Sequence, residues 1–358
     1  MTKKLAYLAL VMILVSVACS APFAADPPAE PTLTPEAVSA LIVSADPDAT
    51  ATATPFQPVG PTLTPTVTFT PEPTATATPT NTPEPVATDL PAPTPVNIPV
   101  ESSQGIVNIL LLGSDSRPNE GGFRTDVIMF VSIDKGKGRV SVISFPRDLY
   151  VTIPGWTTQR INTAFAYGGF SLLAETFQYN FGVRPQYYIL TNFQGFKGII
   201  DSLGGINVNV AAPLSDACDL HQAVKGRCTV NPGVVTMDGD TALWYVRSRH
   251  TTSDFDRTRR AQEVLYGLFN RFMHIDAVKH LPEFYESYKN SVQTNMSPVD
   301  MLPLLPAISQ VASDSSRVHR YAVTPAMVSD YIAPGGAMVL LPNFYAINAM
   351  INEAINGQ

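Results

Sequence analysis

The amino-acid sequence predicts an α/β fold in which helices cover the faces of a mixed β-sheet. From Ile106 onward, short apolar runs rich in β-branched residues alternate with segments whose apolar residues recur at helical spacing. Two of the apolar runs are joined by the turn sequence DKGKG, so at least one pair of strands is expected to be antiparallel. Strands and helices that succeed one another in this way build a mixed sheet with helices packed on it.

The strands are expected where apolar runs end at polar clusters. The first three runs are IVNILLLG, VIMFVSI and RVSVISF, and three further strands are expected at QYYIL, INVNV and ALWYV. Their β-branched and aromatic residues suit a buried, pleated surface, and each run has the length of one strand.

The helices are expected at three amphipathic segments. SLLAETFQYNFG has Gly182 as its stop, and FKGIIDSLGG ends at a pair of glycines. The third segment is DRTRRAQEVLYGLFNRFM, in which apolar residues lie on one helical face: Val264, Leu265, Leu268, Phe269 and Phe272. The pattern continues beyond residue 275 without a clear linker, so one folded domain is expected over residues 104–350.

The first 19 residues have the composition of a signal peptide. Lys3 and Lys4 precede an apolar run over residues 5–18, which is short for a membrane span and typical of a signal sequence. Cys19 follows directly, which favours a bacterial lipoprotein in which Cys19 carries the lipid. Ordinary cleavage and an uncleaved N-terminal anchor remain alternatives. All three place the rest of the chain outside the cytoplasm.

Residues 20–103 are predicted to be a disordered linker rich in Thr and Pro. This segment holds 19 of the 32 prolines, nine acidic residues and no basic ones. It lacks the apolar content that a folded core needs and favours extended polyproline II structure. With two lysines before it, residues 1–103 account for the whole net charge of -7.

The predicted domain is therefore neutral, and its basic residues are mostly arginine. Residues 104–358 hold 21 acidic and 21 basic residues, of which 15 are Arg and 6 are Lys. Arginine presents a planar fork of donors that fits phosphate and carboxylate oxygens. A neutral, exported domain argues against a nucleic-acid partner. Two cysteines remain in it, Cys218 and Cys228, and in an oxidising compartment this pair is expected to form a disulfide.

Charged residues cluster at the ends of several predicted strands. They belong to the segments GSDSR, FRTD, SFPRD and VRSRH: Asp115, Arg117, Arg124, Asp126, Arg147, Asp148, Arg247 and Arg249. Asp126 begins a strand whereas the others follow one. If that strand runs antiparallel to its neighbours, its start lies at the edge where their ends meet. Ligand crevices form at such edges.

The segment YVRSRHTTSDFDRTRRAQ adds to this rim. Arg247 and Arg249 are two apart on a segment expected to be extended, so they point to one side. Arg257 and Arg260 are three apart on a helix that begins near Ser253 and so share a face. Arginines, a helix N-terminus and two carboxylates together suit a diphosphate with a divalent cation, for which Mg²⁺ is the usual choice. Each Asp–Arg neighbour could instead be a surface ion pair. Asp254 and Asp256 are expected to be helix caps, and Arg259 to be solvated.

From about residue 105 to 270 the chain resembles the LytR-CpsA-Psr (LCP) family. The resemblance rests on segments in the family's order: GSDSR, RTDVIMFVSID, VSVISFPRDLYVTIPG, RINTAFAYGG, GFKGIIDSLGGINVNV, MDGDTALWYVRSRH and DRTRRAQEVL. It implies an αβα sandwich with a central mixed β-sheet and an apolar pocket that holds a lipid. It also implies a membrane-attached phosphotransferase that moves a glycopolymer, such as teichoic acid or capsular polysaccharide, from a polyprenyl-diphosphate carrier to peptidoglycan, with Mg²⁺ as cofactor and polyprenyl phosphate as product.

The resemblance also implies roles for individual residues. Asp115 and Asp126 correspond to the magnesium-associated catalytic carboxylates, and Arg147 to a catalytic arginine. The arginines implied to surround the diphosphate are Arg117, Arg124, Arg147, Arg160, Arg247, Arg249 and Arg257. The family usually continues its last motif with Arg-Gln-Gln, whereas here Ala261 and Gln262 follow Arg260. No role is therefore assigned to Gln262.

The chemistry of these residues agrees with a phosphotransfer. Mg²⁺ and preorganised arginines stabilise charge on the transferred and leaving oxygens. Asp115 or Asp126 is a candidate base for the acceptor hydroxyl, and the helices around residues 171–203 and 262–273 are expected to line a groove for the carrier. Two other functions stay open: a polyprenyl-diphosphate hydrolase with water as acceptor, and a module that binds polyprenyl phosphate or wall polymer without turnover.

Overall fold

The computed structural model describes residues 95, 99–100, 105–116, 124–249, 251–274 and 291–357. The predicted signal peptide, Cys19 and nearly all of the predicted linker lie outside these residues. Val100, inside the predicted linker, is already buried in the domain core, and its backbone N–H donates to the Gly182 carbonyl at 3.0 Å.

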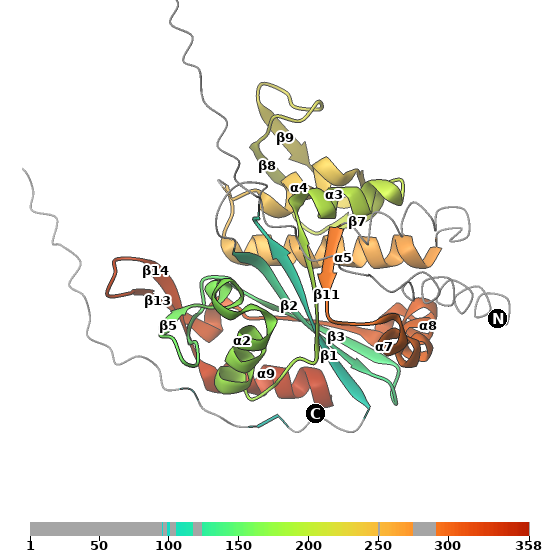
Figure 1. Ribbon diagram of the computed structural model, residues 1–358. Coiled ribbons are helices and arrows are strands. Elements are labelled where there is room, and N and C mark those ends of the chain that lie inside the picture. The colour runs from blue at the N-terminus through green and yellow to red at the C-terminus, as the bar shows by residue number, and fades with distance from the viewer. Residues whose placement is uncertain are drawn as a thin grey trace, which may run out of the picture. The chain divides into compact units, whose positions relative to one another are not determined.

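The centre of the domain is a mixed sheet, as predicted, and it has six strands (Figure 1), of which β11 and β12 were not expected from the sequence. Its strand order is β11-β6-β1-β2-β3-β12. The bounds are β1 Ile106–Ser114, β2 Thr125–Asp134, β3 Arg139–Phe145, β6 Tyr187–Asn192, β11 Val292–Thr294 and β12 Val318–Ala322. β2 runs antiparallel to both β1 and β3, while β6 is parallel to β1 and β12 is parallel to β3.

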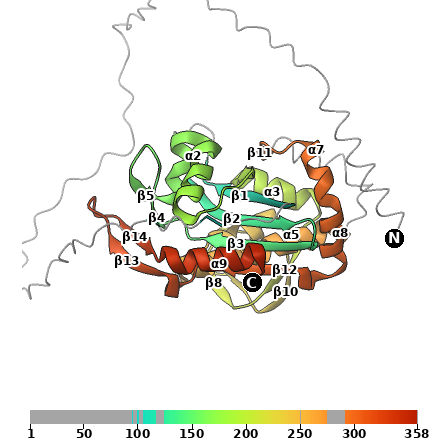
Figure 2. The ribbon, with the colours of Figure 1, turned by 90° about the horizontal axis from the view of Figure 1, so that it is seen from below.

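Helices cover both faces of this sheet, which confirms the αβα sandwich. Figure 1 shows α2 and α9 on one side and α3, α4 and α5 on the other, and Figure 2 shows α2 and α9 in front of the sheet. The bounds of the longer helices are α2 Ala164–Phe181, α3 Phe193–Ser202, α4 Gly239–Arg247, α5 Asp254–His274, α8 Leu305–Ser313 and α9 Phe344–Asn356. α9 continues past residue 350, where the sequence placed the end of the domain.

Short elements complete the domain around this sandwich. Four two-stranded sheets pair β4 Tyr150–Thr152 with β5 Thr158–Arg160, β7 Ile206–Val210 with β10 Gly233–Met237, β8 Leu214–Ala217 with β9 Arg227–Val230, and β13 Val328–Ile332 with β14 Met338–Pro342. Helical turns are α7 Pro298–Met301, η1 Ile161–Thr163, η2 Leu302–Leu304, η3 Ser315–Arg317 and η4 Pro325–Met327.

The layer of α2 and α9 is closely packed by aromatic residues. Phe177 of α2 lies against Phe130 and Phe145 of the sheet, with ring centroids 6.0 and 5.0 Å apart. These three side chains are almost fully buried. A buried aromatic side chain stabilises a fold by about 1.5–3 kcal/mol through its removal from water. This side of the sheet therefore forms a solid hydrophobic core.

The opposite layer forms a second apolar cluster beneath α3, α4 and α5. Ile109 and Met129 of the sheet, Tyr245 of α4 and Val264 of α5 are among its buried members. α5 also approaches β7 closely at Gly267, where an added Cβ would lie 2.7 Å from the Asn207 carbonyl oxygen. Glycine is needed at this contact because no side chain has room there.

The strand predicted at ALWYV is wrong, because these residues lie in helix α4. The Asp238 carboxylate caps the helix and accepts a hydrogen bond from the Thr241 N–H at 2.8 Å. Ala242, Tyr245 and Val246 are the buried residues of this stretch, at the i, i+3, i+4 spacing of one helical face. The β-branched and aromatic composition suggested a strand, but the cap and the burial pattern decide for a helix.

The other predicted elements are found close to their expected places. The DKGKG turn joins the antiparallel strands β2 and β3, and α2 ends at Gly182, whose φ of 70° suits glycine. α2 begins earlier than predicted, at Ala164, and contains a kink at Gly168 and Gly169. Among the described residues, no helix is long and apolar enough to cross a membrane.

Candidate active site

The rim predicted from the strand ends exists, and a cavity opens from it. We call this the rim cavity. It has a volume of about 480 Å³, and its charged lining residues are Asp115, Asp126, Arg147, Arg247, Arg249 and Arg257. Asp115 follows β1, Asp126 begins β2 and Arg147 follows β3. Because β2 is antiparallel to β1 and β3, its first residues meet the ends of its neighbours at one edge of the sheet.

Arg147 is held at the rim by carboxylates from three segments. Its Nη1 donates to Asp126 Oδ1 at 2.8 Å, and its Nε lies 3.4 Å from Asp148 Oδ2 and 4.0 Å from Asp254 Oδ1. Burial alone would lower the pKa of Arg147, but the hydrogen bond and charge of Asp126, with the charges of Asp148 and Asp254, outweigh it and raise that pKa. Arg147 is therefore a fixed cation beside the cavity.

Asp115 lies on the same rim and is tied to the start of β2. Its Oδ1 accepts a hydrogen bond from the Arg124 backbone N–H at 2.7 Å, and its own N–H donates to the Arg124 carbonyl at 3.2 Å. This pair of bonds joins the end of β1 to the start of β2. It holds the Asp115 carboxylate at the edge of the sheet where Asp126 lies. Arg124 itself is exposed and does not belong to the cavity lining among the described residues.

Helix α5 points its N-terminal turn at the rim. Ser253 and Asp256 form a capping box: Ser253 Oγ accepts from the Asp256 N–H at 3.1 Å, and Asp256 Oδ2 accepts from the Ser253 N–H at 3.2 Å. Asp256 is thus a cap, as predicted. Asp254 instead pairs with Arg257, whose Nη2 lies 2.7 Å from Asp254 Oδ1 and 3.3 Å from the Asp126 carbonyl oxygen.

Arg257 is the most buried charge at the cavity. Its side chain is 8% exposed. Burial lowers the pKa of Arg257, and the nearby Arg147 and Arg249 lower it further, against the opposing charges of Asp254 and Asp126. A concentration of guanidinium groups that repel one another and lose water is best relieved by an anion, so this geometry favours binding of a phosphate group.

Arg247 and Arg249 also line the cavity, but for a different reason than the sequence suggested. Arg247 is the last residue of helix α4 and not part of an extended segment. Its guanidinium lies over the ring of Phe193, 4.3 Å from the ring centroid. The chain then becomes extended at Ser248, with φ −54° and ψ 130°, and carries Arg249 to the same opening.

The interior of the rim cavity is apolar. Aliphatic and aromatic side chains from the sheet and from α3, α4 and α5 line it: Leu111, Leu112, Val127, Met129, Ile189, Phe193, Phe196, Ile199, Leu243, Val246, Val264, Leu265, Leu268 and Val292. The predicted lining by residues 262–273 and by the later part of 171–203 agrees with this. The prediction is wrong for α2, which packs on the opposite face of the sheet.

One of the predicted diphosphate arginines, Arg160, takes another place. Arg160 does not line the cavity in the described part of the chain; its Nε lies 3.1 Å from Asp148 Oδ1 and its Nη2 donates to the Met338 carbonyl at 2.7 Å. It reaches the rim only through Asp148, which it shares with Arg147. Arg117 lies outside the described residues.

The arginines that follow Arg257 are structural. Arg260 is 1% exposed and donates to the carbonyls of Tyr245 and Ser248 and to Thr252 Oγ1. Its predicted place beside the ligand is therefore wrong. Arg259 was expected to be solvated, but it pairs with Glu263 and lies 3.7 Å from Asp256. The bonds of Arg260 hold α4 against α5, whereas those of Arg259 lie within α5.

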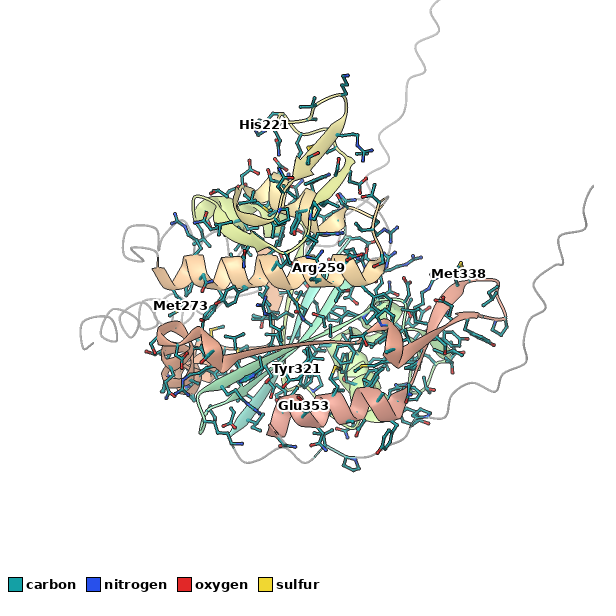
Figure 3. All side chains as sticks on the ribbon, turned by 180° about the vertical axis from the view of Figure 1, so that it is seen from behind. His221, Arg259, Met273, Tyr321, Met338 and Glu353 are labelled. Atoms are coloured by element: carbon teal, nitrogen blue, oxygen red, sulfur yellow. A yellow bond between two sulfur atoms is a disulfide. The ribbon has the colours of Figure 1, made fainter. Side chains whose placement is uncertain are left out.

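Gln262 also has a structural place. Its Nε2 donates to Ser144 Oγ and to the Tyr321 carbonyl, each at 2.7 Å. Figure 3 labels Tyr321 in the sheet and Arg259 on α5, so the view shows the two layers that Gln262 joins. The side chain fastens α5 to β3 and β12 and does not line the rim cavity.

The sequence places Asp148 in the rim cluster without a role, and it does not predict Asp254 as a member of the site. Asp148 directly follows Arg147 in the SFPRD segment, so its position beyond a strand was a signal that the sequence carried. Asp254 was read only as a helix cap. In the structure both aspartates lie within ion-pair distance of Arg147.

A second cavity adjoins the first, and we call it the hairpin cavity. Its volume is about 820 Å³, and it shares Leu243, Arg247 and Arg249 with the rim cavity. One wall is the β8–β9 hairpin, whose loop residue His221 marks the top of Figure 3. The predicted Cys218–Cys228 disulfide is confirmed and closes this hairpin, with Cα atoms 5.7 Å apart.

Asp115 and Asp126 fit a magnesium ion that also binds a phosphate. Mg²⁺ in proteins takes one or two carboxylates together with substrate phosphate oxygens and water. Each carboxylate uses Oδ1 in a hydrogen bond, and among the described residues neither Oδ2 accepts one. The described residues contain no group of three or more Asp, Glu, His or Cys side chains that could hold a metal by themselves. A metal here would therefore need the ligand's own oxygens.

A model of the LytR_cpsA_psr family matches residues 73–349, which is most of the chain. The chain belongs to the LytR-CpsA-Psr family. The match includes every described residue of both cavities.

Two curated relatives are about 30% identical to this chain over the aligned residues. TagT of Bacillus subtilis (strain 168), named a polyisoprenyl-teichoic acid–peptidoglycan teichoic acid transferase, is 29% identical over 228 residues, 62% of this chain and 70% of TagT. MsrR of Staphylococcus aureus (strain COL), named a regulatory protein, is 34% identical over 203 residues, 56% of this chain and 59% of MsrR. The match thus spans less than two thirds of MsrR.

Solved structures of the LytR-CpsA-Psr family share the fold. Bacillus subtilis TagV superposes with a TM-score of 0.59 at 24% identity, over 71% of this chain and 98% of TagV. A structure described as TagT bound to LIIa-WTA gives a TM-score of 0.54 at 22% identity, over 74% of this chain and 97% of that one. These similarities support the mixed sheet between two helical layers.

Proposed function

We propose that this chain transfers a glycopolymer from a polyprenyl-diphosphate carrier to peptidoglycan. One observation carries the proposal: an apolar cavity opens between two carboxylates and four arginines. A polyprenyl diphosphate has the matching division into an apolar chain and a doubly anionic head. The family membership and the printed name of TagT, a transferase with a carrier of this kind, support it.

The carrier would bind with its chain in the rim cavity and its diphosphate at the opening. The apolar lining excludes water from the lipid, and burial of each methylene contributes about 0.8 kcal/mol. The guanidinium groups of Arg147, Arg247, Arg249 and Arg257 converge on the opening and offer charge-assisted hydrogen bonds to phosphate oxygens. The proposal assigns diphosphate contacts to these four arginines, and to Arg117 and Arg124 from their place in the family motifs.

The reaction forms one bond and breaks one. An acceptor hydroxyl oxygen attacks the phosphorus next to the glycopolymer, and the bond from that phosphorus to the polyprenyl phosphate oxygen breaks. The electron pair leaves with polyprenyl phosphate, and the hydroxyl proton passes to a rim carboxylate, Asp115 or Asp126. Arg147 is fixed by Asp126 and Asp148, so it meets the developing charge without reorganising.

Magnesium would be held by Asp115 and Asp126 together with the diphosphate. When bound, Mg²⁺ would neutralise charge on the phosphate oxygens and make polyprenyl phosphate a better leaving group. The chain's own contribution is to place the two carboxylates in one cavity lining, just after β1 and at the start of β2, and to keep Arg147 against Asp126.

The proposed location is the outer face of a bacterial membrane, close to the cell wall. An apolar run and Cys19 at the N-terminus support a lipid anchor or an uncleaved helix there, and the Thr- and Pro-rich segment over residues 20–103 supports a spacer between the anchor and the domain. The disulfide in the β8–β9 hairpin agrees with an oxidising compartment.

The full-length chain in detergent tests this function. It is incubated with a polyprenyl-diphosphate-linked glycan, uncross-linked peptidoglycan and Mg²⁺, and the products are separated by chromatography. We expect glycan attached to peptidoglycan and an equal amount of polyprenyl phosphate. Release of polyprenyl phosphate with free glycan would indicate a hydrolase. Binding of the carrier without any product, where a family member transfers, would show a binding module.

A further inference from the structure

The hairpin cavity is a second chamber beside the rim cavity, and the proposed phosphotransfer step leaves it without an assigned ligand. Its volume is about 820 Å³, enough for several sugar rings. It lies between the β8–β9 hairpin and helix α4 and meets the rim cavity at Arg247 and Arg249. Whatever occupies it therefore reaches the diphosphate from the side of Arg247 and Arg249.

The geometry of the reaction decides which substrate lies on that side. In a displacement at phosphorus the attacking and leaving oxygens are roughly in line. The leaving oxygen belongs to polyprenyl phosphate, whose chain occupies the rim cavity. The attacking hydroxyl must then approach from outside the apolar chamber, and the hairpin cavity meets the rim cavity at Arg247 and Arg249.

The chemistry of the wall fits a saccharide rich in hydroxyl groups. Five aspartates and two arginines line the cavity, and both arginines lie at its border with the rim cavity. Asp148, Asp240 and Asp254 are paired with basic residues outside the lining, and Asp216 and Asp219 are the other two carboxylates of the wall. Carboxylates accept hydrogen bonds from hydroxyls and repel anions. The Asp254 carboxylate is enclosed: its Oδ1 pairs with Arg257 Nη2 at 2.7 Å, while its Oδ2 accepts no hydrogen bond from the described residues. A hydroxyl of an acceptor glycan would supply a donor to Oδ2, whereas a polyanionic chain would be repelled.

We propose that the hairpin cavity binds the acceptor glycan as an uncharged saccharide chain and directs one hydroxyl between Arg247 and Arg249 toward the diphosphate. The inference rests on the proposed transferase function, because that function makes the rim cavity the place of the leaving lipid. It adds a second substrate site, formed by the disulfide-closed hairpin and α4, which the reaction at the rim does not by itself require.

The hairpin is held in place to form this wall. The Trp244 Nε1 donates to the Ala217 carbonyl at 3.0 Å, Gln222 Nε2 donates to Thr241 Oγ1 at 2.9 Å, and Thr251 Oγ1 donates to the Ser215 carbonyl at 3.1 Å. With the Cys218–Cys228 disulfide, these bonds fix the hairpin against α4 and the segment before α5. A wall fixed from both sides suits a preformed binding site.

The test fills the cavity without touching the rim. Ala217 is exposed and lines only the hairpin cavity, so Ala217→Trp places an indole in the acceptor's space. Asp219→Asn is a milder second variant that removes one carboxylate from the wall. Val224→Trp is the matched control, because Val224 is 72% exposed in the hairpin loop and lines neither cavity.

Transfer is measured with full-length chain while soluble peptidoglycan strands and the carrier-linked glycan are varied in turn. We expect Ala217→Trp to raise the KM for the strands about tenfold or more, because the indole occupies space that the acceptor needs. Asp219→Asn should raise it less, the KM for the carrier should not change, and Val224→Trp should behave as the wild type. An unchanged KM for the strands in both cavity variants, or a change in the KM for the carrier alone, would overturn the proposal.

A binding measurement separates this inference from the proposed function. N-acetylglucosamine tetrasaccharide is the probe, and equilibrium dialysis measures its affinity for the wild type, Ala217→Trp and Val224→Trp. Loss of binding in Ala217→Trp alone supports the saccharide site even if no transfer is observed, in which case only the transferase function fails. Equal binding by all three proteins refutes the saccharide site whether or not the chain transfers glycan.

Discussion

At the scale of single residues, neighbouring arginines of one helical turn serve different purposes. Arg257 faces the rim cavity, Arg259 pairs with Glu263, and Arg260 is buried against the carbonyls of Tyr245 and Ser248. Helical spacing predicted that Arg257 and Arg260 share a side, which is a correct reading of the periodicity. It did not predict that α4 covers Arg260, because α4 was expected to be a strand.

The structural role of Arg260 gives a prediction for stability. Arg260→Ala removes three hydrogen bonds and leaves two buried carbonyls without their donors, so it should lower the free energy of unfolding by about 3 kcal/mol. Arg317→Ala is the control, because Arg317 is an exposed arginine paired with Asp314 and should cost less than about 1 kcal/mol. Denaturant titration measures both, and equal losses would contradict a buried structural role for Arg260.

The role of Arg147 gives a prediction for activity. Arg147→Ala removes the cation that meets the developing charge and should lower kcat by about 10²-fold or more. Asp126→Ala removes the partner of Arg147 and should have a similar effect. Arg160→Ala is the comparison, because Arg160 reaches the site only through Asp148 and should lose much less activity. Circular dichroism checks that each variant is folded, and near-normal turnover of Arg147→Ala would remove its proposed role.

At the scale of elements, the cap of helix α4 decides the structure of the segment between β10 and α5. The Asp238 carboxylate accepts hydrogen bonds from Thr241, and these bonds lower the pKa of Asp238 below its ordinary value of 3.8. α4 in turn carries Arg247 and contributes Leu243 and Val246 to the rim cavity. A single capping residue therefore positions one side of the site.

The lowered pKa of Asp238 gives a prediction for acid stability. Because the folded pKa is lowered, the carboxylate stabilises the fold fully above pH 3.8 and loses that contribution as the pH falls through the folded pKa. Asp238→Asn keeps a capping oxygen without a titrating charge, so its Tm should fall less than that of the wild type between about pH 5 and about pH 2.

A second variant at this position provides the control. Asp238→Ala removes the cap itself and should cost about 1 kcal/mol at neutral pH. Thermal unfolding followed by circular dichroism measures all three proteins. Parallel pH profiles for the wild type and Asp238→Asn would show that this carboxylate does not contribute to the acid sensitivity.

At the scale of the whole molecule, the two faces of the sheet differ. The face covered by α2 and α9 is filled by residues such as Phe177 and Phe181, whereas the face covered by α3, α4 and α5 encloses the rim cavity. The first layer stabilises the domain, and the second leaves the space that a lipid chain would occupy. The charged opening lies where the strand ends and the α5 N-terminus meet.

Because only one face of the sheet leaves space for a lipid, a substitution that fills this space should affect donors with long polyprenyl chains more than donors with short ones. Leu265 lines the apolar interior of the rim cavity, and Leu265→Trp would fill part of it. We expect the KM for a long polyprenyl-diphosphate donor to rise about tenfold, while a donor with a short chain is affected much less, because only the long chain needs the filled space. Transfer assays with both donors measure this. Equal effects on both donors would show that the lipid lies elsewhere.

The sequence alone determined four strands of the central sheet (β1, β2, β3 and β6), the presence of helices on its faces and the rim of Asp115, Asp126 and Arg147. It did not predict β11 and β12. The predicted features follow from local composition and from the rule that antiparallel neighbours bring opposite strand ends to one edge, and both can be read along the chain. The disulfide followed in the same way from the count of cysteines in an exported domain.

Only the tertiary structure decided where ALWYV folds, which arginines face the cavity, and that a second chamber adjoins the first. The physical reason is that these features depend on contacts between distant segments: Asp254 with Arg147, Gln262 with Tyr321, and the β8–β9 hairpin with α4. A cavity is space that packing leaves unfilled, and such space appears only when every surrounding element is in place.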